Sequence, residues 1–261
     1  MEKVVNNYTD YLMRLLSDKG LYYFTVGDLA AILKVTRRKA YEAAARLEGR
    51  GLVRRVERGK YVVMGYEPAR ILANPFFVAS HAVRPSYVSF WSALSHYGFT
   101  EQAPRKVFLA SLHRKGEVSF AGFAFKYVSV KPWRFFGYAR ERSGELDFLM
   151  ADREKAVIDS LALPQYAGGM REVVKAVANA QREVDASELQ RYALRMKSAT
   201  LCSRLGYLLE REGINADILF GHASREYVKL DPCGKRAGRW DGRWRVIVNM
   251  TEAELTGWRE T

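Results

Sequence analysis

The first third of the chain shows two hydrophobic periods in succession. Apolar residues three and four positions apart predict a helix over residues 4–19 and two shorter helices over 25–33 and 37–50. Thr25 and Thr36 stand where an N-cap side chain is expected, directly before the two shorter helices. Two helices joined by a short turn are typical of a helix-turn-helix.

A strand-like pattern follows at once. Residues 52–57 and 60–63 are rich in Val and flank the turn Arg58-Gly59, which predicts a β-hairpin with basic residues at its tip. A hairpin after a helix-turn-helix is a wing. We therefore predict a winged helix-turn-helix domain over residues 1–66, and Pro68 marks its end because proline cannot continue a central strand.

The rest of the chain predicts a second, larger domain over residues 67–261 in which helices and strands are mixed. A helix is expected over 86–97, and a second helical region begins at Asp152. Strands are expected between these regions and again near the end, over 106–112, 117–130, 133–139, 146–150, 227–230 and 244–249. The predicted fold class is α+β, with the winged helix-turn-helix domain followed by a mixed α/β domain.

Charge gives the N-terminal domain a function class. The chain carries a net charge of +13, and residues 34–60 alone hold ten Lys/Arg against three Glu. On a helix over 37–50, Ala40, Ala43, Ala44 and Leu47 face one side, whereas Arg38 points to the opposite side. A basic helix-turn-helix with a wing predicts DNA binding, and a basic face that is merely solvated is the alternative.

The expected contacts divide by position. Arg38 should reach base edges in the major groove, and Arg58 and Lys60 on the wing should hold phosphates or the minor groove. The full set expected at DNA comprises Thr36, Arg37, Arg38, Lys39, Tyr41, Arg46, Arg58 and Lys60.

Other classes of function find little support in the residues. No apolar run approaches the length of a membrane span and no signal-peptide core begins the chain, so we expect a cytoplasmic protein without a membrane partner. Cys202 and Cys233 are expected to be reduced thiols. The four histidines form no metal-binding motif and no phosphate-binding loop is present, so we expect no catalytic residue, no metal and no cofactor.

One acidic cluster, Asp152-Arg153-Glu154-Lys155, has two interpretations. Acidic residues near a strand end followed by Glu and Lys resemble metal-dependent nucleases. That chemistry usually places Glu and Lys on one face of a strand, whereas Glu154 and Lys155 are adjacent at a predicted helix start. Asp152 as an N-cap and Glu154 in the first helical turn have a structural explanation, which we favour.

Three segments of the second domain follow the predicted winged helix in a fixed order: SALSHYGFTEQAP at 92–104, ADREKAVID at 151–159 and SRLGYLLE at 203–210. Taken together in this order, they resemble AbiEi-type antitoxins, the DNA-binding half of type IV toxin–antitoxin systems. The similar residues of the second domain are Ser92, Thr100, Glu101, Gln102, Asp152, Glu154, Lys155, Asp159, Arg204 and Tyr207.

The resemblance implies two functions on one chain. The N-terminal domain would bind inverted repeats in operator DNA and repress its own operon. The C-terminal domain would counteract a nucleotidyltransferase-like toxin without forming a stable complex with it. Within that domain, Thr100, Glu101 and Gln102 either satisfy backbone groups or face a partner. Arg204 either pairs with Glu154 or Asp159 or remains exposed.

Two other function classes remain as alternatives. The first is a winged-helix regulator whose C-terminal domain senses a small ligand in an apolar pocket. The second is a metal-dependent enzyme acting on nucleic acid. A neighbouring reading frame that encodes a nucleotidyltransferase-like protein would favour the antitoxin over both.

Overall fold

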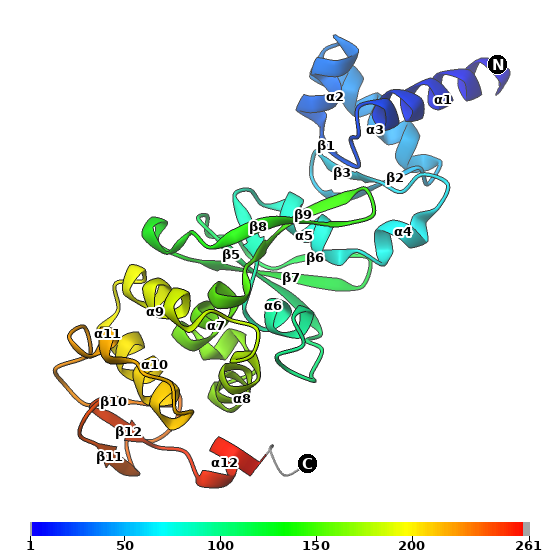
Figure 1. The fold of residues 1–261 in the computed structure, drawn as a ribbon. Coiled ribbons are helices and arrows are strands. Elements are labelled where there is room, and N and C mark those ends of the chain that lie inside the picture. The colour runs from blue at the N-terminus through cyan, green and yellow to red at the C-terminus, as the bar shows by residue number, and fades with distance from the viewer. Residues whose placement is uncertain (1, 258–261) are drawn as a thin grey trace.

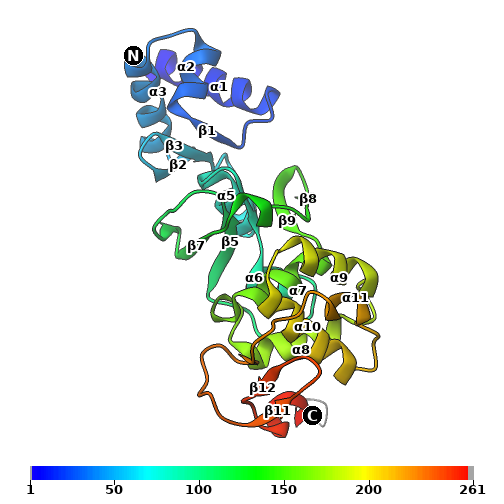
Figure 2. The ribbon, with the colours of Figure 1, turned by 90° about the vertical axis from the view of Figure 1, so that its left-hand side faces the viewer.

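A computed structural model describes residues 2–257. The elements succeed one another along an elongated molecule (Figures 1 and 2). The N-terminal helices lie at one end, a six-stranded sheet occupies the middle, and a small C-terminal sheet lies at the opposite end. The elongated molecule therefore has two ends that lie far apart, and the segments at both ends are rich in Lys and Arg.

The N-terminal domain is a winged helix-turn-helix. It comprises α1 (Glu2–Asp18), β1 (Tyr23–Thr25), α2 (Val26–Leu33), α3 (Arg37–Gly49), β2 (Val53–Glu57) and β3 (Lys60–Val63). Thr25 and Asp28 form a capping box at the start of α2, because each side chain accepts from the other residue's backbone N–H. The Thr36 side chain accepts from the backbone N–H of Lys39 at the start of α3. Both predicted N-caps are confirmed.

The three-stranded sheet of this domain, in the order β1-β3-β2, is buried on both faces. Residues alternate between the faces along each strand, as strand geometry requires. Phe24, Tyr61 and Val63 pack with α1, α2 and α3 in the core of the N-terminal domain. Tyr23, Val56, Val62 and Met64 instead join the core of the second domain. The wing sheet is thus the layer that connects the two domains.

The second domain is built on a six-stranded mixed sheet in the order β6-β7-β5-β4-β9-β8. The short helix α4 (Pro68–Leu72) links it to the wing. The helices α5 (Pro75–Ala82) and α6 (Phe90–His96) pack on β5 (Lys106–Ser111). The other strands are β4 (Ser86–Val88), β6 (Val118–Phe120), β7 (Phe123–Ser129), β8 (Tyr138–Ser143) and β9 (Leu146–Ala151), and η1 (Pro132–Arg134) is a 3₁₀ turn. The break between β6 and β7 falls at the predicted Ala121-Gly122.

Two predictions in this region are wrong. The helix expected over 86–97 starts only at Phe90, because Ser86–Val88 form the strand β4 in the interior of the sheet. This strand pairs antiparallel with β5 and in parallel with β9, two strands that lie far along the chain. The strand expected over 133–139 begins only at Tyr138, after the 3₁₀ turn. Pairing with distant strands decided the first case, and local periodicity does not record it. In the second case β8 pairs with the next strand in the chain, β9.

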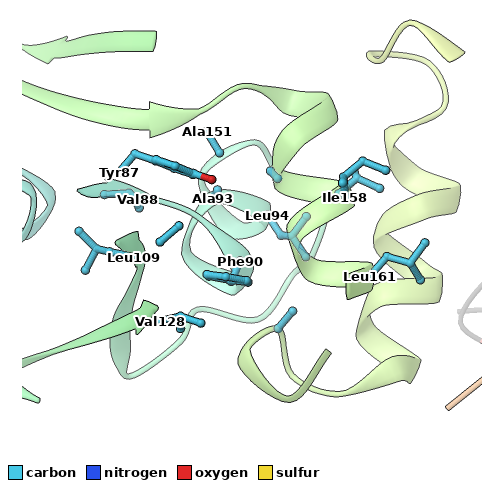
Figure 3. Packing of buried hydrophobic residues seen from close by; sticks show 14 of the residues in the cluster. Tyr87, Val88, Phe90, Ala93, Leu94, Leu109, Val128, Ala151, Ile158 and Leu161 are labelled. Carbon is cyan, nitrogen blue, oxygen red and sulfur yellow. The ribbon is translucent and has the colours of Figure 1, made fainter. Parts of the chain in front are cut away.

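A helical layer follows the sheet. It contains α7 (Arg153–Ala162), the 3₁₀ turn η2 (Pro164–Tyr166), α8 (Met170–Ala180), α9 (Ala186–Arg195), α10 (Ala199–Arg211) and α11 (Asp217–Phe220). Figure 3 shows the apolar contact between the two layers: Phe90 and Leu94 from α6 lie between Ile158 and Leu161 from α7 on one side and Leu109 and Val128 from the sheet on the other. Asp152 caps α7 through the backbone N–H of Lys155, as predicted.

The chain ends in a small sheet, β10-β12-β11, and a short helix. Its elements are β10 (Val228–Lys229), β11 (Arg239–Asp241), β12 (Val246–Val248) and α12 (Glu252–Thr256). The sequence pattern predicted β10 and β12 but neither β1, β11 nor α12, each of which has five residues or fewer. Among the residues described, no helix has both the length and the apolar character needed to cross a membrane.

Gly206 is the closest point of contact between α10 and the C-terminal sheet. A Cβ added there would lie 2.2–2.4 Å from atoms of the Trp244 ring, and Trp244 is buried. Gly206→Ala should therefore lower the free energy of unfolding by about 1–3 kcal/mol through overpacking. Chemical denaturation of the full chain measures this loss. Gly49→Ala in α3 is the matched control, since a Cβ there meets nothing within 4 Å and should cause no loss. Equal stability of both variants would contradict the packing argument.

Candidate nucleic-acid interface

Helix α3 buries one face and exposes a basic one. Ala40, Ala43, Ala44 and Leu47 are at most 3% exposed, as their spacing predicts. The opposite face is open to solvent and carries small residues beside long basic ones, so the backbone of α3 is accessible to a groove. Its exposed members are Arg37, Arg38, Lys39, Tyr41, Glu42, Ala45, Arg46 and Gly49.

Arg38 lies near the start of this face, in the first turn of α3. Its side chain is 91% exposed and forms one ion pair within α3, between its Nε and Glu42 Oε1 at 3.3 Å. An exposed pair of this kind contributes little to stability, so exchanging Glu42 for a DNA acceptor costs little. Arg46 lies on a flank of α3, and its guanidinium is 5.9 Å from the centre of the Tyr8 ring in α1. Arg38 is therefore free to reach a base, whereas Arg46 has a partner on the protein.

The wing turn is fixed beside α3. Gly59 has φ +73°, and its carbonyl accepts from the backbone N–H of Val26 at 2.9 Å. The Tyr41 hydroxyl would lie 2.9 Å from a Cβ at Gly59, so the Tyr41 side chain rests against the turn. Arg58, next to Gly59, is exposed. Tyr41 thus contacts the wing, and Arg58 extends from it into solvent.

Lys60 does not share this exposed surface. Its Nζ donates to the carbonyl of Ala82 in the second domain at 2.5 Å and lies 3.2 Å from Glu57 Oε2. The expectation that Lys60 holds DNA conflicts with this geometry, because the side chain points toward the seam between the domains. Arg55, which the predicted set omits, is exposed on β2 opposite Tyr61. Strand alternation places Arg55 on the side of the wing that faces the helices, and that signal was present in the sequence.

Polar contacts tie the wing to the second domain. Glu57 lies 2.5 Å from Lys115 Nζ. Burial raises the pKa of the Glu57 carboxyl, but the hydrogen bonds and charges of Lys115 and Lys60 outweigh it and hold that pKa below its usual range. The Arg54 guanidinium lies 5.4 Å from the centre of the Phe120 ring on β6. On the other side of the seam, Glu145 accepts from Tyr22 and from Arg70. The wing therefore has a defined orientation relative to the six-stranded sheet.

The same seam contains a cleft of about 410 Å³, which is within the range of small-molecule pockets. Both domains contribute to its walls, among them Thr25, Asp28, Lys60, His81 and Arg84. Burial lowers the pKa of His81 to about 4, so this imidazole is neutral at physiological pH. This cleft lies between the domains, whereas the ligand-sensing alternative placed a pocket within the C-terminal domain. A pocket of about 600 Å³ also lies there, with Phe76, Pro104 and Phe123 in its walls.

The segment 151–159 forms a buried polar network. Lys155 is 0% exposed and donates from Nζ to Asp159, whose Oδ2 also accepts from the hydroxyls of Tyr87 at 3.0 Å and Ser89 at 2.8 Å. The Phe136 ring centre lies 4.7 Å from Lys155 Nζ. Burial lowers the pKa of the Lys155 ammonium, and the Asp159 carboxylate opposes that shift. The pair therefore binds α7 to β4 from within the core.

Asp152 and Glu154 are occupied by protein groups. Asp152 accepts from Lys155 N through Oδ1 and from the Tyr192 hydroxyl through Oδ2, both at 2.8 Å. Glu154 accepts from the backbone N–H of Asp185 at 2.9 Å. Within residues 2–257, no three His, Cys, Asp or Glu side chains are grouped so as to hold a metal ion. These contacts support the structural interpretation of the cluster over a nuclease site.

The segment 92–104 also makes internal contacts. Ser92 Oγ accepts from Phe108 N at 2.9 Å, which joins α6 to β5. In the loop after α6, Thr100 and Gln102 donate to the two carboxylate oxygens of Glu172 on α8, at 2.8 and 3.2 Å. Glu101 is exposed and lies 3.1 Å from Lys175 Nζ. These contacts fasten the loop to α8, and Glu101 and Gln102 are both exposed to solvent.

The segment 203–210 fastens the C-terminal sheet to α10. Arg204 is 8% exposed and donates from Nε to the carbonyl of Lys229 at 2.8 Å. Both expectations for Arg204 are wrong, since it neither pairs with Glu154 or Asp159 nor remains exposed. Tyr207 is buried and accepts from Arg239 at 3.3 Å. These partners lie on β10 and β11, the latter of which the sequence did not predict.

Comparison with known proteins identifies the N-terminal domain. Residues 10–63 match the family of AbiEi antitoxin transcriptional regulators. The winged helix-turn-helix is similar to that of the AbiEi antitoxin regulators. The predicted resemblance is thus confirmed over the second half of α1, the helix-turn-helix and the wing, and the matched family is one of transcriptional regulators. No curated protein matches the chain.

The AbiEi-type domain and the domain behind it together match a known fold. The crystal structure of the RV2827C protein from Mycobacterium tuberculosis is similar with a TM-score of 0.62. The match covers 98% of this chain and 95% of that chain at 13% identity. It therefore shows a shared fold over both domains, which confirms the α+β class.

The buried pair Lys155–Asp159 yields a prediction about stability. Lys155→Met leaves the Asp159 carboxylate buried without its counter-charge, so the free energy of unfolding should fall by about 3–5 kcal/mol. In Lys155→Met/Asp159→Asn, the amide oxygen still accepts from Tyr87 and Ser89 and no charge is buried. The double variant should lose less than the sum of the two single losses, as measured by denaturant titration. Additive losses would show that the two side chains are not coupled.

Proposed function

We propose that this chain is the antitoxin of a type IV toxin–antitoxin system. Its AbiEi-type domain binds inverted repeats in operator DNA and represses its own operon. Its C-terminal domain, residues 67–261, counteracts a nucleotidyltransferase-like toxin without a stable complex. The observation that carries the DNA half is the exposed basic face of α3 beside the exposed wing residue Arg58.

The geometry supports a division of labour at the DNA. Arg38 is nearly fully exposed and opposite the buried face of α3, so it enters the major groove when α3 does. Arg58 extends from the wing turn, beside the groove that α3 would occupy, and meets the phosphate backbone. Lys60 is left out because it donates to Ala82. Arg37, Lys39 and Arg55 supply further positive charge around Arg38.

Support for the antitoxin half comes from the second domain. The three segments that resemble the family are the ones that join its layers, through Ser92, Asp159 and Arg204. We infer that these segments preserve the shape of the domain, and that toxin is counteracted through its surface. Glu101 and Gln102, both exposed in the loop after α6, are members of the set that face solvent.

The first functional prediction separates base from phosphate contacts. Arg38→Ala should weaken binding to the operator by about 1–3 kcal/mol and should weaken binding to unrelated DNA much less. Arg58→Ala should weaken both DNAs about equally and should reduce the slope of log K against log salt by about 0.9. Fluorescence anisotropy at several salt concentrations measures both effects on the full chain. The full chain is required because removing residues after 66 would expose the second face of the wing sheet.

Arg182→Ala is the control for these variants. Arg182 is also exposed, but it follows α8, which lies far from α3. Its removal should therefore change neither the affinity for the operator nor the affinity for unrelated DNA. Equal losses for Arg38→Ala and Arg58→Ala on both DNAs would refute the assignment of Arg38 to base recognition. Salt-independent binding by the unaltered chain would refute the phosphate contacts.

The second prediction concerns antitoxin activity. When toxin and antitoxin are co-expressed from unrelated promoters, Asp152→Asn should still rescue growth, because Asn caps a helix about as well as Asp. Asp152→Ala should cost about 0.5–2 kcal/mol of stability. Arg38→Ala should rescue as well, because it impairs only operator binding. A folded Asp152→Asn protein that binds operator but does not rescue growth would favour the enzyme alternative, since Asn poorly replaces a carboxylate that holds a divalent ion.

A further inference from the structure

The C-terminal sheet carries a basic surface that the proposed DNA interface does not use. Residues 225–245 hold seven Lys/Arg against three Asp/Glu, so this segment contributes +4 of the +7 net charge of residues 67–261. Five of the seven cations are exposed and form no ion pair with any residue described in the structure. They are Arg225, Lys235, Arg236, Arg239 and Arg245. We call Arg225, Lys235, Arg236 and Arg245, together with Tyr227 and Trp240, the C-terminal basic surface, and leave Arg239 out because it donates to Tyr207 on α10.

Two aromatic rings lie among these cations. Trp240 on the edge strand β11 is 55% exposed, and its ring centre lies 4.6 Å from that of Tyr227 at an interplanar angle of 60°. Arg236 donates to the carbonyl of Tyr227 at 3.3 Å. Arg239 points to the other face of β11, where it donates to the Tyr207 hydroxyl on α10. An exposed indole supported by a second ring offers a flat apolar face bordered by positive charge.

The backbone under this surface is held in a fixed shape. Asn249 accepts from Asp231 N at 2.8 Å and donates to the carbonyls of Asp231 and Lys235, both at 2.9 Å. Lys229 Nζ donates to the carbonyl of Gly234 at 2.7 Å. Gly238 has φ +132°, and a Cβ there would lie 2.2 Å from the Val248 carbonyl oxygen, so this close approach admits only glycine. The loop that carries Lys235 and Arg236 is therefore preorganised.

We propose that the C-terminal basic surface binds single-stranded RNA. Unpaired bases stack on exposed aromatic rings while Arg and Lys contact the phosphates, and the surface presents both groups together. A duplex keeps its bases stacked internally and offers no free base to Trp240. Unpaired loops and ends are the usual sites of RNA recognition, and the surface suits that class of site. Because this surface lies at the opposite end of the molecule from α3, both can be occupied at once (Figure 1).

The test measures the affinity of the full chain for a labelled, unstructured RNA of about 12 nucleotides by fluorescence anisotropy. Trp240→Ala should weaken binding roughly 5- to 150-fold, the loss expected for removing one base stack. Trp240→Phe should restore most of that loss, because it keeps a ring. Arg236→Ala should lower the slope of log K against log salt by about 0.7, since it removes one phosphate contact to a single strand.

Controls separate this surface from the proposed DNA interface. Arg38→Ala and Arg182→Ala should leave RNA affinity unchanged, and Trp240→Ala should leave operator affinity unchanged. Unchanged RNA binding by Trp240→Ala, or binding of duplex RNA as tight as that of the single strand, would overturn the proposal. Tighter binding of the matching DNA strand, or of an acidic polypeptide, would overturn the assignment to RNA. If the chain binds the RNA but not the operator, the proposed function is refuted and the proposal of RNA binding stands.

Discussion

Burial of the wing sheet on both faces is the constraint on which the rest of the structure depends. In a free-standing winged helix, one face of the small sheet closes the core and the other meets solvent. Here Phe24 and Tyr61 close the helical core, while Tyr23 and Val62 enter the core of the second domain. A sheet that serves two cores fixes the orientation of both domains. Helix α3, which we propose to bind DNA, is therefore held at a set angle to the C-terminal domain.

This constraint also explains which basic residues remain available. Lys60 and Arg54 lie where the wing meets the second domain, and their charges are directed to the Ala82 carbonyl and the Phe120 ring. Arg38 and Arg58 lie on the helix and turn that face away from the seam. A count of basic residues overstates the DNA interface, because part of the charge holds the domains together. What remains is concentrated on α3 and the tip of the wing.

The family-like segments of the second domain have a physical role that does not require an active site. Each segment places a polar side chain where two layers meet: Ser92 between α6 and β5, Asp159 between α7 and β4, and Arg204 between α10 and β10. Buried polar groups are costly unless every partner is present, so such positions specify one arrangement of the layers. The basic charge of this domain lies elsewhere, on a small sheet that α10 secures.

The sequence by itself determined the parts whose cause is local. Thr36 as a cap, the apolar face of α3, the turn at Gly59 and the cap at Asp152 all follow from residues within a few positions of one another. The tertiary structure alone decided the rest. Ser86–Val88 become a strand because β5 and β9 pair with them, and Arg204 is buried because the Lys229 carbonyl accepts its hydrogen bond. Such contacts join residues far apart in the chain, and neither the hydrophobic period nor the spacing of residues indicates which distant segment a residue will contact.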